Sequence, residues 1–272
     1  MDAHWKESMS DLMTIEEMRQ HEWFVSWSGG KDSTATIILM HENKIPIKKI
    51  IYVRMMWDET IPATMPEINS FVDRASEVFR SWGYPVDIIP SMRTAVSQME
   101  RVFHKSHEPD KNGKKYGLYA FLRRRCTMTS RKTDTIKKNT PKDGFHMIGY
   151  RADELDRIHR LGGERQSIMV TMGITEAETF DICRKYNMLS PLYELGLARD
   201  GCWFCPNAAK AERQYVREVH PHLFELITKM IEDFEHPLRR MFPLNNYVQD
   251  YMKEQLEKQQ ITFDEYMEGI KE

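Results

Sequence analysis

The chain has 272 residues, of which 41% are hydrophobic and 29% are charged, as expected for a folded protein with a sizeable core. Its net charge of −2 excludes an overall field that would draw it to nucleic acid or to a membrane surface. No run of about 18 apolar residues is present, and the N-terminus lacks the basic start and apolar core of a secretory signal. We therefore expect a cytoplasmic protein without a membrane partner, whose four cysteines lie in a reducing compartment.

Short apolar runs alternate with helical patterns along most of the chain. Residues 1–21 are predicted to form a helical lead-in, and strands are predicted at residues 23–27, 48–55, 84–90 and 145–150. Helices are predicted between and after these strands, at residues 33–43, 66–82, 91–103 and 175–187. Strands that alternate with helices of this length predict an α/β fold with a parallel sheet covered on both faces.

The segment SGGKDS, residues 28–33, lies between the first predicted strand and the first predicted helix. Adjacent glycines at Gly29 and Gly30 allow backbone N–H groups to approach an anion without interference from a Cβ atom. The following helix start adds its positive end, Lys31 adds a point charge, and the hydroxyls of Ser28 and Ser33 can donate to phosphate oxygens. The simpler alternative is a helix N-cap with a permissive turn.

Asp32, in the same turn, is unsuited to bind phosphate directly but suits a Mg²⁺ ion that bridges to the phosphates. The turn therefore predicts binding of a pyrophosphate group together with Mg²⁺. It differs from the Walker pattern, which places a longer spacer between its first glycine and its Gly-Lys pair. Transfer of a γ-phosphate is consequently not the expected reaction.

A second charged segment, RADE at residues 151–154, also begins where a predicted strand ends. In parallel sheets ligands bind beyond the carboxyl ends of the strands, so this segment is expected near the first one. Arg151 can contact phosphate or sulfate through two hydrogen bonds, and Asp153 or Glu154 can orient a nucleophile or hold Mg²⁺. The alternative is a charged turn with internal salt bridges.

The four cysteines are candidate metal ligands. Cys202 and Cys205 have the C-x₂-C spacing of a chelate, while Cys126 and Cys183 stand alone. Together they fit a four-thiolate site for either Zn²⁺ or a [4Fe-4S] cluster, and spacing does not choose between the two. Cys126 and Cys183 can instead be small buried apolar residues. If Cys183 is not a ligand, three cysteines would leave one iron open to a sulfide.

Residues 101–139 are strongly basic, with 12 Lys or Arg against three Asp or Glu. Such a stretch can follow a nucleic-acid backbone. The aromatic residues Tyr116, Tyr119 and Phe121 lie within it, as a surface for stacking bases would require. The simpler interpretation is a solvated basic loop. The alternative is a surface that binds nucleic acid, and the sequence leaves both open.

Four segments in order carry a family resemblance: SGGKDS (28–33), RRCTMTSRK (124–132), IGYRADE (148–154) and LYELGLARDGCWFCPNA (192–208). Together they resemble the PP-loop proteins of the adenine-nucleotide α-hydrolase-like superfamily, and in particular the phosphoadenosine-phosphosulfate-reductase-like branch. The resemblance covers about residues 23–210. It implies a Rossmann-like (HUP-type) sheet that binds ATP or a related adenine nucleotide. It also favours [4Fe-4S] over Zn²⁺, because related members place a cluster beside the nucleotide using a lone cysteine and a C-x₂-C pair.

The last part of the chain is helical in character, at residues 212–230 and 245–272. One helix face carries apolar residues that are predicted to be core: Phe224, Ile227, Met230, Ile231 and Phe234. We predict an α/β nucleotide-binding domain over residues 1–210 with a cysteine metal site, and a helical extension over residues 211–272 packed on it. The fold class predicted is thus α/β, with part of the metal site carried by the helical C-terminal region.

The resemblance implies an enzyme that cleaves ATP between its α- and β-phosphates, adenylates a substrate, and supports sulfur transfer, with nucleic acid as candidate acceptor and a sulfur-donor protein as candidate partner. The residues predicted to be catalytic are Lys31, Asp32, Arg151 and Asp153. The predicted nucleotide-binding residues are Ser28, Gly29, Gly30, Lys31, Asp32, Ser33, Arg151 and Glu154. The predicted metal ligands are Cys126, Cys183, Cys202 and Cys205.

Two alternative functions are weighed against this one. A reductase of phosphoadenylyl sulfate or adenylyl sulfate needs a nucleophilic cysteine in its C-terminal tail, and the tail ITFDEYMEGIKE contains none. Assimilatory adenylyl-sulfate reductases also carry an adjacent cysteine pair where this chain has Arg125 and Cys126. A nucleotide sensor without catalysis, in a phage or defence system, is the second alternative, and intact Lys31, Asp32 and Arg151 count against it.

Overall fold

The computed structural model describes residues 11–105, 112–121 and 126–233, together with a few single residues between 247 and 257. The chain forms two compact units. The sheet unit comprises residues 11–55, 64–92 and 132–200, and the second unit comprises residues 56–63, 93–131 and the described residues from 201 onward. The division therefore differs from a single boundary at residue 210, because residues 56–63 and 93–131 join the C-terminal segment rather than the sheet.

The sheet has five strands in the order β3-β2-β1-β4-β5, and every neighbouring pair is parallel. The strands are β1 (Trp23–Trp27), β2 (Ile47–Arg54), β3 (Val86–Pro90), β4 (Phe145–Met147) and β5 (Arg165–Gln166). The predicted α/β class with a parallel sheet flanked by helices is confirmed, and the strand order is that of a Rossmann-like sheet. β4 ends three residues before the predicted strand does, so Ile148 to Tyr150 already belong to the loop.

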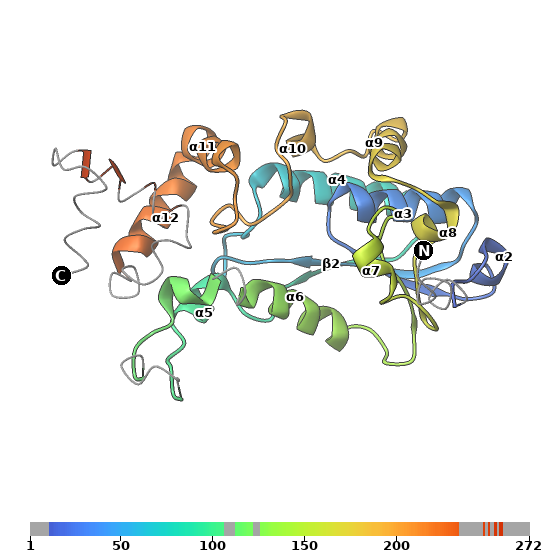
Figure 1. Cartoon of the computed structure of the whole chain (residues 1–272), viewed down its shortest axis with the longest axis horizontal. Coiled ribbons are helices and arrows are strands. Elements are labelled where there is room, and N and C mark those ends of the chain that lie inside the picture. The colour runs from blue at the N-terminus through green and yellow to red at the C-terminus, as the bar shows by residue number, and fades with distance from the viewer. Residues whose placement is uncertain are drawn as a thin grey trace. The chain divides into compact units, whose positions relative to one another are not determined.

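Helices cover both faces of this sheet, as Figure 1 shows for α3 (Lys31–Glu42) and α4 (Pro66–Ser81) on one side and α6 (Thr127–Lys138) on the other. α4 begins with Pro66 at its first helical position, where the missing N–H costs nothing. Its buried residues recur at helical spacing and face the sheet: Ile68, Phe71, Val72, Ala75, Ser76 and Phe79. The apolar pattern that predicted this helix is therefore its packing face.

The core of the sheet unit fixes the end of β1. Trp27 is 1% exposed, and its ring contacts those of Tyr52, Phe71 and Phe79 at centroid distances of 5.4, 6.3 and 5.1 Å. Its indole N–H donates to Thr34 Oγ1 at 3.0 Å. Because a buried tryptophan is held both by packing and by this hydrogen bond, the junction between β1 and α3 is rigidly placed.

Shorter helices complete the sheet unit: α2 (Ile15–Met18), α7 (Leu155–Ile158), α8 (Ile168–Met172), α9 (Glu176–Lys185) and α10 (Pro191–Glu194). At the start of α9 the Glu178 carboxylate accepts from the backbone N–H of Thr175 at 2.8 Å and from its hydroxyl at 2.7 Å, and α9 packs against α3. The predicted helical lead-in over residues 1–21 reduces to α2 in the described part of the chain, since residues 1–10 lie outside it.

The second unit contains α5 (Ala95–Met99), the 3₁₀ helix η2 (Gly117–Phe121), α11 (Lys210–Val219) and α12 (Pro221–Asp233). Ile227 and Met230 of α12 are 1% and 4% exposed, in agreement with the predicted core stripe. The side chain of Ile231, residue Phe234 and most of the helix predicted at residues 245–272 lie outside the described residues.

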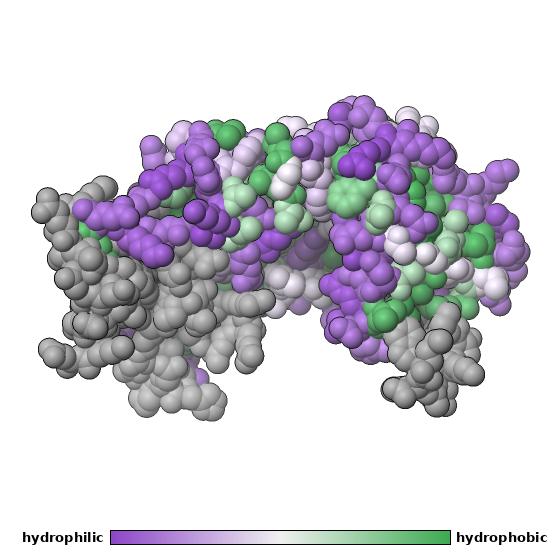
Figure 2. Space-filling model, turned by 45° about the horizontal axis from the view of Figure 1, so that its top comes forward, coloured by the Kyte–Doolittle hydropathy of each residue, from purple (hydrophilic) through white to green (hydrophobic). Residues whose placement is uncertain are grey.

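Hydrophobic side chains at the surface are dispersed. The large apolar residues that are most exposed are Met92, Val102, Leu155, Met172, Leu195 and Val219. On the face drawn in Figure 2, hydrophobic residues form small groups among hydrophilic ones. Among the described helices, none combines the length and the apolar character needed to span a bilayer.

Candidate phosphate site at the switch point of the sheet

The strand order of the sheet reverses at β1, which lies between β2 and β4. In open α/β sheets, ligands bind beyond the carboxyl ends of the strands at such a switch point. Residues 28–33 follow the end of β1, and residues 148–154 follow the end of β4. A Cβ atom added to Gly149 would lie 3.2 Å from both Cα and N of Ser33. The two loops therefore pack backbone against backbone, as their parallel strands predict.

The glycine turn has a backbone that favours glycine. Gly29 has a φ of +84°, and a Cβ atom there would lie 3.3 Å from Val72 Cγ2, so both conformation and packing select glycine. Gly30 is the N-cap of α3 and provides no side-chain cap. Because unpaired N–H groups and a positive partial charge gather at a helix start, this turn has the character of an anion site.

The two serines of the turn brace it internally. Ser28 N–H donates to Ser33 Oγ at 3.0 Å, the two hydroxyl oxygens lie 2.9 Å apart, and Ser33 Oγ donates to the carbonyl of Gly30 at 3.1 Å. Ser28 Oγ also accepts from the N–H of Gly30 at 3.3 Å. The hydroxyls of Ser28 and Ser33 therefore stabilise the turn itself. That they also donate to phosphate, as the sequence predicts, stays a prediction.

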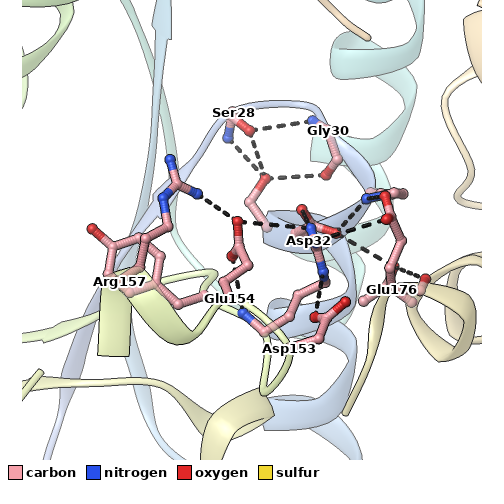
Figure 3. Close-up of polar contacts among 12 residues, drawn as sticks. Ser28, Gly30, Asp32, Asp153, Glu154, Arg157 and Glu176 are labelled. Atoms are coloured by element: carbon pink, nitrogen blue, oxygen red, sulfur yellow. Dashed lines mark hydrogen bonds and ion pairs between the residues drawn. The ribbon is translucent and has the colours of Figure 1, made fainter. Parts of the chain in front are cut away.

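Lys31, Asp32 and Arg151 form one charged network, drawn in Figure 3. Lys31 Nζ lies 2.8 Å from Asp32 Oδ1 and 2.9 Å from an oxygen of Glu176, and its side chain is only 7% exposed. Arg151 Nη1 donates to Asp32 Oδ2 at 2.7 Å, and its Nε donates to Asp153 Oδ1 at 3.0 Å. Asp32 thereby joins the loop after β1 to the loop after β4.

Glu154 organises the loop after β4 from within. One of its oxygens accepts from the Arg151 backbone N–H at 3.1 Å, and the other accepts from Arg157 Nη1 at 2.7 Å. The internal salt bridges of the alternative interpretation are therefore present. Burial acts to lower the pKa of Arg151, but the carboxylates of Asp32, Asp153 and Glu154 outweigh it and hold the pKa above its ordinary value.

One face of α9, which the sequence analysis did not assign to the site, lies against the glycine turn. Glu176 pairs with Lys31, Thr179 Oγ1 donates to Asp32 Oδ1 at 3.3 Å, and the Phe180 ring lies 5.3 Å from Lys31 Nζ. Cys183 follows on the same face. The spacing i, i+3, i+4, i+7 is that of a single helix face, and it could have been found in the sequence.

Tyr193 and Asp200 also reach the turn. A Cβ atom on Gly30 would lie 3.5 Å from Asp200 Oδ2 and 3.6 Å from the Tyr193 hydroxyl oxygen, and the Tyr193 ring lies 6.0 Å from Lys31 Nζ. Burial, followed by the neighbouring Asp200 and Asp32 carboxylates, raises the pKa of Tyr193 above its ordinary range. A neutral phenol and a carboxylate thus stand beside the amides of the turn.

Cys183 lies apart from the other three cysteines along the chain and has a buried side chain. Its side chain is fully buried in the sheet unit, and its thiol donates to the carbonyl of Lys31 at 3.3 Å. Burial and the Asp32 carboxylate raise the pKa of this thiol to about 12, whereas a cysteine must lose its proton to bind a metal. The burial of Cys183 favours the alternative of a small buried apolar residue, and its role as a metal ligand stays a prediction.

The other three cysteines belong to the second unit and are partly exposed. Cys205 N–H donates to the carbonyl of Cys202 at 3.0 Å, so the C-x₂-C pair spans one turn. Trp203 lies between the two cysteines in the sequence, and its side chain is fully buried. Its indole N–H donates to the carbonyl of Pro62 at 2.9 Å. Among the described residues, no three His, Cys, Asp or Glu side chains converge closely enough to hold a metal, so a complete ligand set is not assembled.

The predicted surface for stacking bases is not formed by the described aromatics. Phe121 is 1% exposed, and its ring packs on that of Phe204 at 5.0 Å. Tyr116 is half-buried; its ring stacks on that of Phe103 at 3.9 Å and lies 4.8 Å from the Arg101 guanidinium. The side chain of Tyr119 and residues 122–125 lie outside the described part. The exposed lysines in the described part of this stretch are Lys105, Lys114, Lys115, Lys137 and Lys138.

Comparison with known proteins gives little beyond the fold. No protein-family model matches the chain, and no curated protein matches it either. Among solved structures, the U34-tRNA thiolase NcsA from Methanococcus maripaludis, solved with its [4Fe-4S] cluster, is 16% identical, with a TM-score of 0.39 over 87% of this chain and 80% of that one. This likeness is too distant for the activity, cluster or substrate of that protein to be carried over.

Proposed function

We propose that this chain is an enzyme of the PP-loop kind, which cleaves ATP between its α- and β-phosphates and adenylates an acceptor for sulfur transfer. The observation that carries the proposal is the meeting of the uncapped glycine turn after β1 with Arg151 from the loop after β4, joined through Asp32 at the switch point of the sheet. A turn of this kind suits linked phosphates.

Each residue of the network has a role in that reaction. The amides around Gly30 and the ammonium of Lys31 would bind the β-phosphate, and the guanidinium of Arg151 would bind the α-phosphate on which charge develops. Attack by an acceptor oxygen on the α-phosphorus breaks the α–β bond and releases pyrophosphate. A sulfur nucleophile then displaces AMP from the adenylated acceptor. Asp153 would orient the acceptor.

The proposal includes two metals with different ligands: Mg²⁺ at a carboxylate and a second metal at cysteine thiolates. The Asp32 carboxylate has the right chemistry for Mg²⁺, but both of its oxygens already accept from Lys31, Arg151 and Thr179, so the ion must compete for them. Cys202 and Cys205 are suited to hold a [4Fe-4S] cluster or Zn²⁺, with Cys126 of the same unit as third ligand. Such a centre would supply a site for sulfide.

The reductase alternative is disfavoured by the chemistry of the cysteines. A reductase needs a reactive thiolate, and Cys183, the cysteine beside the glycine turn, is buried with a pKa of about 12. The remaining cysteines lie in the second unit. A sensor without catalysis would need phosphate binding but no acceptor. Asp153, whose side chain is 40% exposed beside Arg151, favours the enzyme.

The acceptor is proposed from charge alone. The basic stretch at residues 101–139 with exposed Lys114 and Lys115 suits a nucleic-acid backbone, and a sulfur-donor protein is the proposed partner. Since Phe121 is buried and the ring of Tyr116 already stacks on Phe103, the contact would depend on phosphates rather than on stacked bases. Binding that weakens steeply with salt is the corresponding expectation.

The reaction is tested by its products. Anaerobically purified chain is incubated with α-labelled ATP, Mg²⁺, sulfide as the sulfur nucleophile and a bulk tRNA acceptor; the label is followed by chromatography, and pyrophosphate is assayed separately. We expect AMP and pyrophosphate in equal amounts, because the bond broken lies between the α- and β-phosphates. ADP with phosphate would contradict the proposal. Sulfite from phosphoadenylyl sulfate and a thiol reductant would establish the reductase instead.

A further inference from the structure

We propose that Glu176 sets the affinity of the glycine turn for phosphate by competing with it for Lys31 and Arg151. The inference rests on the proposed function, since it concerns the same turn. Glu176 is the first residue of α9, and its carboxylate lies 2.9 Å from Lys31 Nζ and 3.8 Å from Arg151 Nη2. It therefore contacts both cations on which anion binding depends, and Figure 3 shows Glu176 close to Asp32.

α9 is placed to make this contact. Thr179, Phe180 and Cys183 hold the helix on the first turn of α3 through Asp32, the Lys31 ammonium and the Lys31 carbonyl. Glu176 itself is 53% exposed, while Lys31 is 7% exposed. The carboxylate thus stands between a buried ammonium and the solvent, where an approaching phosphate oxygen would have to replace it.

The charge balance of the network shows why the competition matters. Lys31 and Arg151 face four carboxylates, those of Asp32, Asp153, Glu154 and Glu176. A phosphate that enters this site meets an excess of negative charge. Of the two cations, Asp153 and Glu154 contact Arg151 and not Lys31, and Glu154 also pairs with Arg157 at 2.7 Å; Asp32 joins the two loops. Glu176 pairs with both cations. Unlike Asp32, it belongs to α9 and does not connect the loop after β1 to the loop after β4.

The test compares two substitutions on the same helix, each of which replaces a carboxylate by the neutral amide of the same shape. Glu176→Gln removes the competing charge. Asp181→Asn removes the charge of a residue that is 80% exposed and that, among the described residues, forms an ion pair with Arg184 of the same helix at 3.6 Å. Titration calorimetry of the full chain with inorganic pyrophosphate, at low salt, gives the dissociation constants. We expect E176Q to bind about three- to tenfold more tightly than wild type, within the range that screening leaves to a half-exposed charge, and D181N to bind like wild type.

A gain in affinity separates competition from structural damage, which would weaken binding. In the background of Lys31→Ala, E176Q should give little or no gain in affinity, because the gain arises from the Lys31 ammonium that E176Q frees. Binding by E176Q that equals or falls below that of wild type would overturn the inference and leave the proposed function standing. A wild-type chain that binds neither pyrophosphate nor ATP would contradict the proposed function, and with it the inference.

Discussion

Replacement of Lys31 by alanine is expected to lower the rate of ATP cleavage by about 10²–10³-fold, the usual cost of removing one preorganised charged donor from a transition state. The ammonium is buried, and carboxylates and aromatic rings fix its position. No other lysine among the described residues reaches Asp32 or Glu176. The measurement is the rate of AMP release at saturating ATP, compared with that of wild type.

The matched control for K31A is Lys48→Ala. Lys48 pairs with Glu22 at 2.6 Å, and both side chains are at least half exposed, so its loss should leave the rate unchanged. K31A is expected to fold, because Asp32 keeps its hydrogen bond to Arg151, and its thermal unfolding midpoint reports this. A folded K31A variant that turns over ATP like wild type would contradict the role given to the turn.

Replacement of Cys202 and Cys205 together by serine is expected to abolish metal binding by the chain. The pair spans one turn that is anchored by buried Trp203, and a chelate that loses both thiolates loses its strongest ligands. Iron and zinc analysis of anaerobically purified protein, with a visible spectrum, measures the loss. Iron with broad visible absorption identifies a cluster, and zinc without colour identifies a zinc site.

Cys183→Ser is the control for that experiment. Because the Cys183 thiol is buried and protonated against the Lys31 carbonyl, its replacement should leave the metal content of the chain unchanged. Cys126→Ser, from the same unit as the pair, should lower it. Metal that is retained by the double variant would remove the C-x₂-C pair from the proposal, and metal that is lost from C183S would make Cys183 a ligand.

Local patterns in the sequence predicted most of the sheet unit. β1 and α4 were predicted to within a residue or so, because buried apolar runs and a proline at a helix start are local signals. β5 is two residues long and exists through its pairing with β4, so no local pattern could reveal it. The units divide differently from the predicted boundary because residues 56–63 pair with Trp203, far away in sequence.

The candidate site was predicted in part for the same reason. The loops after β1 and β4 carry concentrated charge and glycine, and a parallel sheet brings them together. The face of α9 was missed because its four residues, an acid, a hydroxyl, an aromatic ring and a thiol, form no recognisable motif. Only the tertiary packing shows that this face lies against the start of α3. The spacing of Cys183 carries no information about its burial, which the structure adds.

The most direct measurement is a titration of the isotope-labelled chain with inorganic pyrophosphate, followed residue by residue through its backbone amide resonances. The N–H groups at the start of α3 form the proposed cradle, so the resonances of Gly29, Gly30 and Lys31 are predicted to shift first and farthest. A saturating titration that leaves these three unmoved, or moves only amides of the second unit, would contradict the claim that this turn holds linked phosphates.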